Sequence, residues 1–111
     1  PNQIPERLAM EMALTGDFIS AARASEVGLI NRVVPDGTAL EAAKELAATI
    51  CANGPLAVRI SKQVMTESKD WSSAEMWEKQ QSMVMPVMTS EDAIEGATAF
   101  AEKRAPNWKG K

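Results

Sequence analysis

The sequence predicts a mainly α-helical protein that contains one short strand, at about residues 29–34. Apolar residues recur at three- and four-residue spacing through most of the chain, which is the period of an amphipathic helix. Residues that favour helix starts, such as Ser20 and Ser90, precede some of these segments. One run differs, because LINRVV is rich in β-branched and apolar residues and lies between Gly28 and Pro35.

Two helices are predicted before the strand, over residues 5–14 and 21–27. Gly16 lies between them and can adopt the left-handed conformation that ends a helix. Ser20 is placed to cap the second helix, and Gly28 to close it. The strand is therefore expected directly after a helix of fewer than two full turns.

The predicted strand needs a partner. Backbone N–H and C=O groups of a strand must be paired, and no other segment has the composition of a strand. We expect the partner in a second copy of the chain or in a region that precedes it. The chain starts at Pro1 and not at Met, which favours a piece of a longer protein. The alternative is that residues 29–34 form an extended connector lying on helices.

Three helices are predicted between the strand and Ser90. Capping-box patterns at residues 38–41 and 72–75 mark two helix starts, and Pro55 marks another. Pro86 is expected to kink or end the last of the three, because its ring clashes with the preceding turn and it has no N–H to donate.

The last helix is predicted to start after Ser90 and to stop before Pro106. Gly96 in its interior costs about 1 kcal/mol relative to alanine, which indicates a close approach of another part of the chain. Five apolar or small residues are expected to form the buried stripe of this helix: Ala93, Ile94, Ala97, Phe100 and Ala101.

Composition indicates one small soluble domain. The chain has 111 residues, 45% of them hydrophobic, and a net charge of −3. No apolar run approaches the roughly 20 residues of a membrane-spanning helix, and the acidic balance argues against nucleic-acid binding. The single cysteine, Cys51, is expected to be buried; it cannot form an intrachain disulfide, which favours a cytoplasmic protein.

The residues needed for common catalytic and metal sites are missing. The chain has no His and no Tyr, which excludes Ser-His and Cys-His nucleophiles. A metal site lacks ligands too, because there is one cysteine and the acidic residues at helix ends and turns are explained by capping or solvation. We therefore predict no catalytic residue and no metal ligand in these 111 residues.

The end of the chain is basic, although the chain as a whole is acidic. Four basic residues follow the last acidic residue, with Trp108 among them: Lys103, Arg104, Lys109 and Lys111. A phosphate group would be attracted there. The alternative is that these charges complement the helix dipole and are otherwise solvated.

Methionines form a weaker candidate site. Met76, Met83, Met85 and Met88 lie within two neighbouring helix segments. Flexible thioethers adapt to acyl chains of different lengths, but methionine also fills irregular cores, and both interpretations stay open.

An ordered set of segments resembles the crotonase superfamily, the enoyl-CoA hydratases and isomerases. The resemblance extends to Lys111 and is carried by these segments: PERLAMEMAL at 5–14, LTG at 14–16, GLINRVV at 28–34, NGPLAV at 53–58, SEDA at 90–93 and AFAEKR at 99–104. It implies the helical C-terminal domain of the crotonase α/β fold. Residues 1–35 would be the end of the core region, and residues 36–111 a helical region for oligomerisation and coenzyme A contact.

The resemblance implies an enoyl-CoA hydratase, a lyase of fatty-acid oxidation that hydrates 2-enoyl-CoA to 3-hydroxyacyl-CoA, assembled as a trimer or a dimer of trimers. Coenzyme A would enter only as part of the substrate, and no other cofactor is implied. In the family the oxyanion hole and catalytic glutamates lie upstream, so no catalytic residue is carried over and the chain alone is expected to be inactive.

Two residues match a Phe-x-x-Lys pattern of the family's last helix. Lys103 is then expected near the nucleotide phosphate of a neighbouring subunit's coenzyme A, and Phe100 beside the pantetheine and acyl channel. The alternatives are an enoyl-CoA isomerase, another acyl-CoA lyase or hydrolase of the superfamily, or a non-catalytic helical oligomerisation module.

Overall fold

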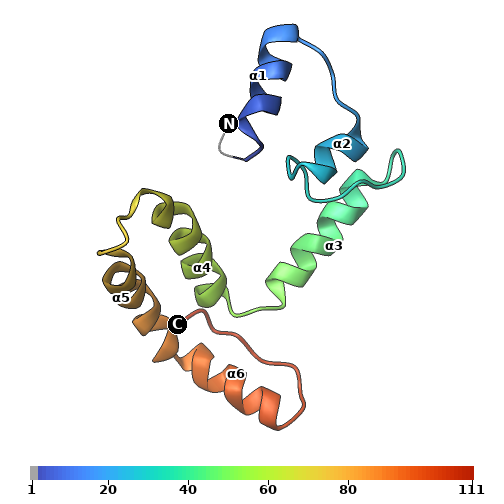
Figure 1. The fold of residues 1–111 in the computed structure, drawn as a ribbon. Helices are drawn as coiled ribbons and strands as arrows, with labels where there is room; N and C mark the ends of the chain where they lie inside the picture. Colours follow the sequence, from blue (N-terminus) through green and yellow to red (C-terminus); the bar gives the residue numbers. More distant parts are fainter. Residues whose placement is uncertain (1–2) are drawn as a thin grey trace. The chain divides into compact units, whose positions relative to one another are not determined.

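All regular secondary structure in the computed structural model is helical over the residues that it describes, 3–111. The chain divides into two compact units, residues 1–43 and residues 44–111. Figure 1 labels the helices along the chain. The predicted division of roles at residues 35 and 36 concerns function and stays a prediction.

Unit 1 contains helices α1, Glu6–Thr15, and α2, Ala21–Glu26. Gly16 ends α1 in the left-handed conformation, with φ of 73°, as its sequence position predicts. The Ser20 hydroxyl caps α2 by accepting a hydrogen bond from the Arg23 N–H at 3.1 Å. Both predicted helices are therefore confirmed, as are the end of α1 at Gly16 and the cap of α2 at Ser20.

The predicted strand is absent from the described residues. After Gly28, the N–H of Leu29 donates to the Ala24 carbonyl at 2.8 Å and closes the end of α2. Residues 29–31 then bend, and the next residues are irregular; within 3–111 the N–H groups of residues 31–34 find no partner. A strand forms only when its backbone is hydrogen-bonded to a neighbouring strand, and the described residues offer none. Pairing of residues 29–34 with a strand from outside the chain stays a prediction.

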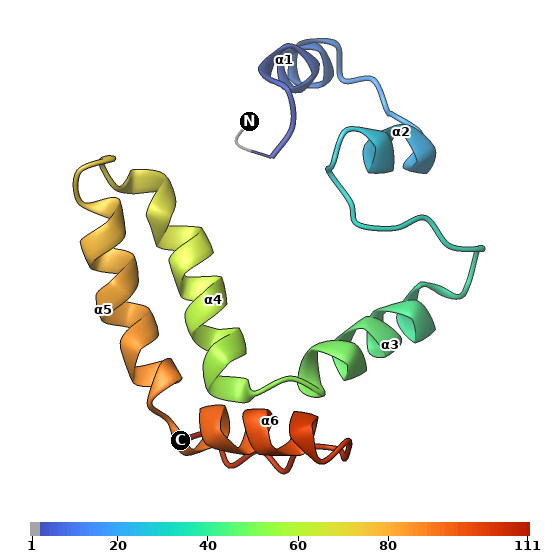
Figure 2. The same cartoon turned by 60° about the horizontal axis from the view of Figure 1, so that its bottom comes forward.

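Helix α3, Ala39–Cys51, begins in unit 1 and continues into unit 2. Unit 2 then contains helices α4, Pro55–Glu67; η1, a short 3₁₀ helix at Ser68–Asp70; α5, Met76–Met88; and α6, Glu91–Ala101. Figure 2 shows α4 and α5 side by side, with η1 at their connection and α6 following α5.

Most helix boundaries of unit 2 follow the residues that predict them; the exception is α5, which begins at Met76, four residues after the predicted cap Ser72. Pro55 is the first residue of α4, where its missing N–H costs nothing. The carboxylate of Glu75 accepts the Ser72 N–H at 3.3 Å just before α5. Helix α5 continues past Pro86 and ends two residues later, at Met88. The Ser90 hydroxyl caps α6 by accepting the Ala93 N–H at 3.0 Å.

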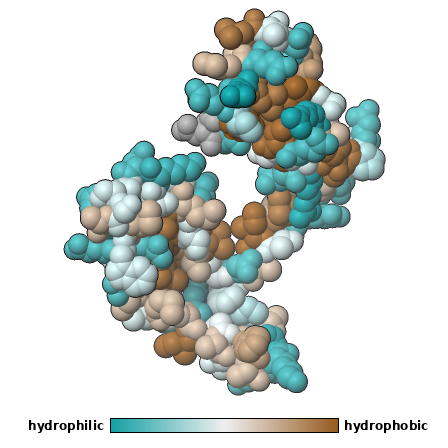
Figure 3. Space-filling model, viewed as in Figure 1, coloured by the Kyte–Doolittle hydropathy of each residue, from teal (hydrophilic) through white to brown (hydrophobic). Residues whose placement is uncertain are grey.

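Few side chains of the described residues are buried. Ala24 and Ala99 are the buried apolar side chains within residues 3–111, and Ser90 and Asp92 are the buried polar ones. Large apolar side chains are instead visible on the surface of both units (Figure 3). Cys51, predicted to be buried, is also exposed. The apolar faces of these helices require other surfaces to cover them.

Candidate functional site

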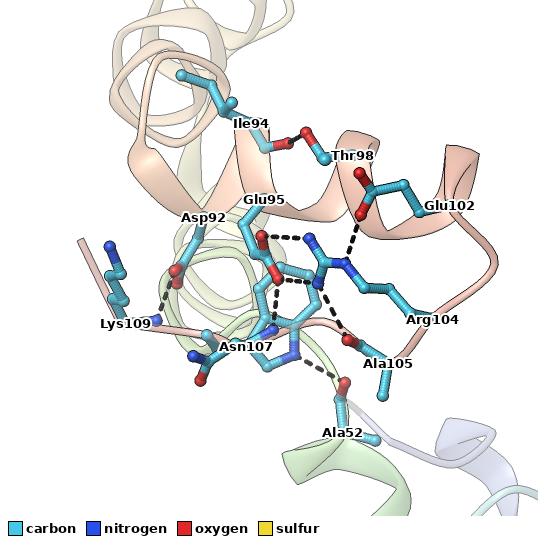
Figure 4. A network of polar contacts seen from close by, with 11 residues as sticks. Ala52, Asp92, Ile94, Glu95, Thr98, Glu102, Arg104, Ala105, Asn107 and Lys109 are labelled. Atoms are coloured by element: carbon cyan, nitrogen blue, oxygen red, sulfur yellow. Dashed lines mark hydrogen bonds and ion pairs between the residues drawn. The ribbon is translucent and has the colours of Figure 1, made fainter.

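The C-terminal residues 105–111, here called the strap, fold back along α6 (Figure 4). The Asp92 carboxylate holds its end, because one oxygen accepts the Lys109 N–H at 2.7 Å and the other accepts the Gly110 N–H at 2.9 Å. The Asp92 N–H in turn donates to the Lys111 carbonyl at 3.1 Å. Asp92 is only 5% exposed, so both carboxylate oxygens are satisfied by the strap and not by water.

Glu95, one turn further along α6, holds the start of the strap. Each of its two carboxylate oxygens accepts a hydrogen bond from one terminal nitrogen of the Arg104 guanidinium, at 2.6 and 3.0 Å. One of these oxygens also accepts a hydrogen bond from the Asn107 N–H at 2.6 Å. These hydrogen bonds, first from Arg104 and then from Asn107, lower the pKa of Glu95 from 4.5 to about 2. Arg104 also donates from Nε to Glu102 at 2.6 Å. Glu95 is therefore the acceptor at the centre of the polar network in Figure 4.

Trp108 fixes the middle of the strap by contacts with two helices. Its indole N–H donates to the Ala52 carbonyl at 2.9 Å, next to the end of α3. Its ring lies against Gly96 so closely that a Cβ added at that glycine would be 3.1 Å from the ring. The close approach predicted at Gly96 is confirmed, and the indole is what makes it.

Lys103 occupies a strained turn at the end of α6. Its φ of 53° is the one left-handed value for a residue other than glycine within the described part of the chain. The N–H of Lys103 donates to Phe100 at 3.3 Å, and the N–H of Arg104 donates to Ala99 at 3.0 Å. These two bonds form the usual left-handed helix end, with lysine where glycine is normally found.

The four basic residues of the C-terminal segment have different surroundings. Arg104 is paired with Glu95 and Glu102, and the ammonium groups of Lys109 and Lys111 lie 3.4 and 3.6 Å from Glu91. Among the described residues, Lys103 alone of the four has no acidic partner. The structure thus separates Lys103 from the other three by its lack of an acidic partner, a distinction that the charge pattern of the sequence did not make.

Phe100 is 87% exposed, on the last turn of α6. The stripe predicted to be buried on this helix is mostly uncovered, because Ile94 is 68% exposed and Ala97 and Ala101 are also exposed. That prediction is wrong for this chain. The strap covers the other face of α6, where Asp92, Gly96 and Ala99 lie, and no described segment covers the apolar one.

The methionines predicted as a candidate lining do not gather in one cavity. Only Met88 borders the apolar hollow of about 290 Å³ beside Trp108, together with residues such as Val87 and Ala57. Met76 and Met85 are 41% and 50% exposed at the surface. The described residues therefore give this candidate no common site.

The strap itself was not predicted from the sequence. No role in the strap was assigned to Asp92 or Glu95 from the sequence. The sequence contains one signal that indicates the strap, since a glycine inside a helix and an aromatic residue after the helix end form a complementary pair, Gly96 and Trp108. The nine-residue separation of Glu95 and Arg104 follows no helical period and gives no such signal.

The described residues lack two further features. They contain no group of three or more His, Cys, Asp or Glu side chains placed to hold a metal ion. Within the same residues, every helix is too short or too polar to cross a bilayer.

The whole chain, residues 1–111, matches the enoyl-CoA hydratase/isomerase family, and the chain belongs to that family. It is 48% identical over 109 residues to an enoyl-CoA hydratase of Mycobacterium tuberculosis, covering 98% of this chain and 41% of that protein. It is 38% identical over 115 residues to a carnitinyl-CoA dehydratase of Salmonella typhi, covering 100% of this chain and 44% of that protein.

Solved structures give the same result. A crystal structure of an enoyl-CoA hydratase from Mycobacterium tuberculosis H37Rv matches with a TM-score of 0.98 and 53% identity, over 100% of this chain and 44% of that one. A probable enoyl-CoA hydratase/isomerase from Mycobacterium abscessus matches with a TM-score of 0.94 and 56% identity, over the same shares. The helical part of the crotonase fold is thereby confirmed, and the chain spans less than half the length of these relatives.

Proposed function

We propose that residues 1–111 are the helical, coenzyme A-contacting part of an enoyl-CoA hydratase, which adds water to the double bond of 2-enoyl-CoA in fatty-acid oxidation in the cytoplasm. Family membership and the likeness to enoyl-CoA hydratases at 48% and 53% identity support this activity. Coenzyme A enters as part of the substrate, and the reaction needs no other cofactor.

The observation that carries the proposal is the state of Lys103. Its ammonium is left without an acidic partner at the end of α6, while the neighbouring Arg104 is neutralised by two glutamates. Phe100 lies three residues earlier and is almost fully exposed. An unpaired ammonium and an exposed aromatic ring three residues apart in the sequence suit the phosphate and pantetheine parts of a coenzyme A ester.

The proton transfers of hydration would be performed by residues outside this chain. The chain contains no His and no Tyr, and Glu95 is occupied by Arg104 and Asn107. Its lowered pKa, about 2, makes Glu95 a poor proton carrier near neutral pH. The purified 111-residue chain should therefore show no turnover of crotonyl-CoA above the buffer rate; measurable turnover would disprove this assignment.

Self-association is the second part of the proposal, as a trimer or a dimer of trimers. The apolar stripe of α6 is uncovered, with Ile94 68% and Phe100 87% exposed. Burial of apolar area stabilises association by about 25 cal/mol per Å² before the entropy costs are subtracted. A second copy that covers this stripe would bring Phe100 and Lys103 to a neighbouring subunit's ligand.

The Lys103 assignment is tested in an enzyme of family length that carries these residues. Lys103→Ala should raise KM for crotonyl-CoA about tenfold and leave kcat nearly unchanged, because the phosphate contact is equally strong in substrate and transition state. Lys109→Ala is the matched control, since it removes an equally basic residue that Glu91 already neutralises. Equal KM values for the Lys103 variant and the parent would show that Lys103 does not contact the phosphate and only complements the helix dipole in solvent.

A second candidate is another acyl-CoA reaction of the same superfamily. The 38% identity to a carnitinyl-CoA dehydratase favours this alternative over a non-catalytic oligomerisation module. The isomerases and other acyl-CoA lyases or hydrolases belong to the same alternative. Comparing crotonyl-CoA hydration with isomerisation of a 3-enoyl-CoA, in the same enzyme of family length, distinguishes these reactions.

A further inference from the structure

We propose that Glu95 is a positioning residue for Lys103: through Arg104 and the Asn107 N–H it holds the left-handed turn from which the Lys103 ammonium meets the nucleotide phosphates. The inference rests on the proposed function, because it assigns a role to the residue that fixes the proposed phosphate contact. Glu95 itself touches no substrate in this scheme and acts only through the turn.

The turn at the end of α6 needs stabilising contacts from other residues, because the residue with the left-handed backbone is a lysine. A left-handed backbone brings the Cβ of any residue other than glycine close to a neighbouring carbonyl, and lysine, unlike asparagine or aspartate, has no short polar side chain to compensate locally. Lys103 nevertheless has a φ of 53°. Such conformations persist where the surrounding contacts over-determine them.

The contacts of Glu95 bracket this turn. Its two carboxylate oxygens bind both terminal nitrogens of Arg104, the residue directly after Lys103, at 2.6 and 3.0 Å. The same carboxylate accepts the N–H of Asn107, three residues further on, at 2.6 Å. A bidentate guanidinium–carboxylate pair fixes orientation as well as distance, which a single hydrogen bond does not.

Glu95 is well placed to act as a fixed anchor. It lies in the middle of α6, and its side chain is only 23% exposed. The Lys103 N–H bonds back to Phe100, so the same turn also connects the two residues proposed to contact coenzyme A. If the turn were less rigid, the Lys103 ammonium would keep its charge but would occupy many positions.

Neutralisation of the Arg104 charge by Glu95 supports the positioning role of Glu95. Glu95 and Glu102 both bind the Arg104 guanidinium, so its charge is neutralised inside the chain. Lys103 then supplies the unpaired positive charge at this helix end. A phosphate that approaches the turn is therefore directed to one ammonium.

The test uses an enzyme of family length that carries these residues, with two substrates. Crotonyl-CoA has the nucleotide phosphates, and S-crotonyl-pantetheine lacks the whole nucleotide. Glu95→Gln keeps the shape of the side chain and removes its charge; Arg104→Lys keeps the charge and removes the bidentate geometry. Each should raise KM for crotonyl-CoA by about threefold to tenfold, the range expected for coupled neighbours, with kcat unchanged.

The second substrate separates positioning from general destabilisation. KM for S-crotonyl-pantetheine should stay the same in both variants, because this substrate has no phosphate for Lys103 to contact. A merely structural role for Glu95 would raise KM for both substrates. Glu91→Gln is the matched control on the same helix, since it removes ion pairs with Lys109 and Lys111 and leaves the Lys103 turn intact.

A double variant distinguishes failure of this inference from failure of the proposed function. If Glu95 acts through Lys103, Glu95→Gln should add nothing to the KM of Lys103→Ala. If Lys103→Ala raises KM and Glu95→Gln and Arg104→Lys do not, the positioning role is overturned and the coenzyme A contact stands. If Lys103→Ala has no effect on KM, the contact itself is wrong, and the positioning role falls with it.

Discussion

Two irregular segments of this chain, residues 29–34 and the strap, satisfy their backbones differently. The strap has no helix or strand, yet its Lys109 and Gly110 N–H groups donate to the buried Asp92 carboxylate. The N–H groups of residues 31–34 have no partner within residues 3–111. An irregular segment can therefore satisfy several of its backbone N–H groups when side chains of a neighbouring helix supply the acceptors.

The two segments differ in how far this chain supplies their contacts. The strap carries its own anchors, because Trp108 packs on α6 and bonds to the end of α3. Residues 29–34 carry the apolar and β-branched composition of a strand. Within residues 3–111, only Leu29 and Ile30 of this segment donate backbone hydrogen bonds, both to the Ala24 carbonyl. Pairing of these residues with a strand from outside the chain stays a prediction, and the chain spans less than half the length of its relatives.

Removing the aromatic anchor should weaken the strap most. Trp108→Ala deletes the ring that packs on Gly96 and the N–H that bonds to Ala52. Truncating a partly buried aromatic side chain should lower the free energy of unfolding of residues 44–111 by about 2–3 kcal/mol, measured in urea. Trp77→Ala is the control: its side chain is 72% exposed, and it should change stability by about 0.5 kcal/mol or less.

Asp92→Asn should have the next largest effect. The amide keeps one acceptor oxygen and turns an N–H donor toward the second strap N–H, which leaves that group unsatisfied in a buried position. The expected loss is about 1.5–2 kcal/mol in the same urea measurement. Asp70→Asn, at an exposed position in η1, should cause no comparable loss; equal effects at the two positions would remove the special role of Asp92.

Acid should release the start of the strap at low pH. The pKa of Glu95 is lowered from 4.5 to about 2, so its stabilising effect is complete above about pH 4.5 and is lost as the pH falls through about 2. The Asn107 amide signal in NMR should follow this transition. In Glu95→Gln the same signal should not follow it, and a transition near pH 4.5 in the parent chain would contradict the lowered pKa.

The smallest effect should be seen at residues 31–34 by hydrogen exchange. In the 111-residue chain their amides should exchange at rates close to those of an unfolded peptide, while Lys109 and Gly110 are protected. In an enzyme of family length, residues 31–34 should become protected as well. Protection of residues 31–34 in the 111-residue chain would show that they already have a partner there.

Local signals predicted the helices well. Ser20 and Ser90 cap the helices that they precede, and Gly16 ends α1 with positive φ, because these are interactions between residues four or fewer positions apart. The apolar stripe of α6 was recognised, but its burial was not correctly predicted. Periodicity shows which face is apolar and says nothing of whether this chain supplies the surface that covers it.

The sequence by itself determined the order of the helices, most of their ends and the family, and it named Phe100 and Lys103 as candidate residues. Only the tertiary structure decided which basic residues are neutralised, because Glu95 and Arg104 meet through a reversal of the chain that no periodicity encodes. It also decided that Lys103 has a left-handed backbone. Helix signals act within one turn, whereas carboxylate–guanidinium contacts depend on where the folded chain returns.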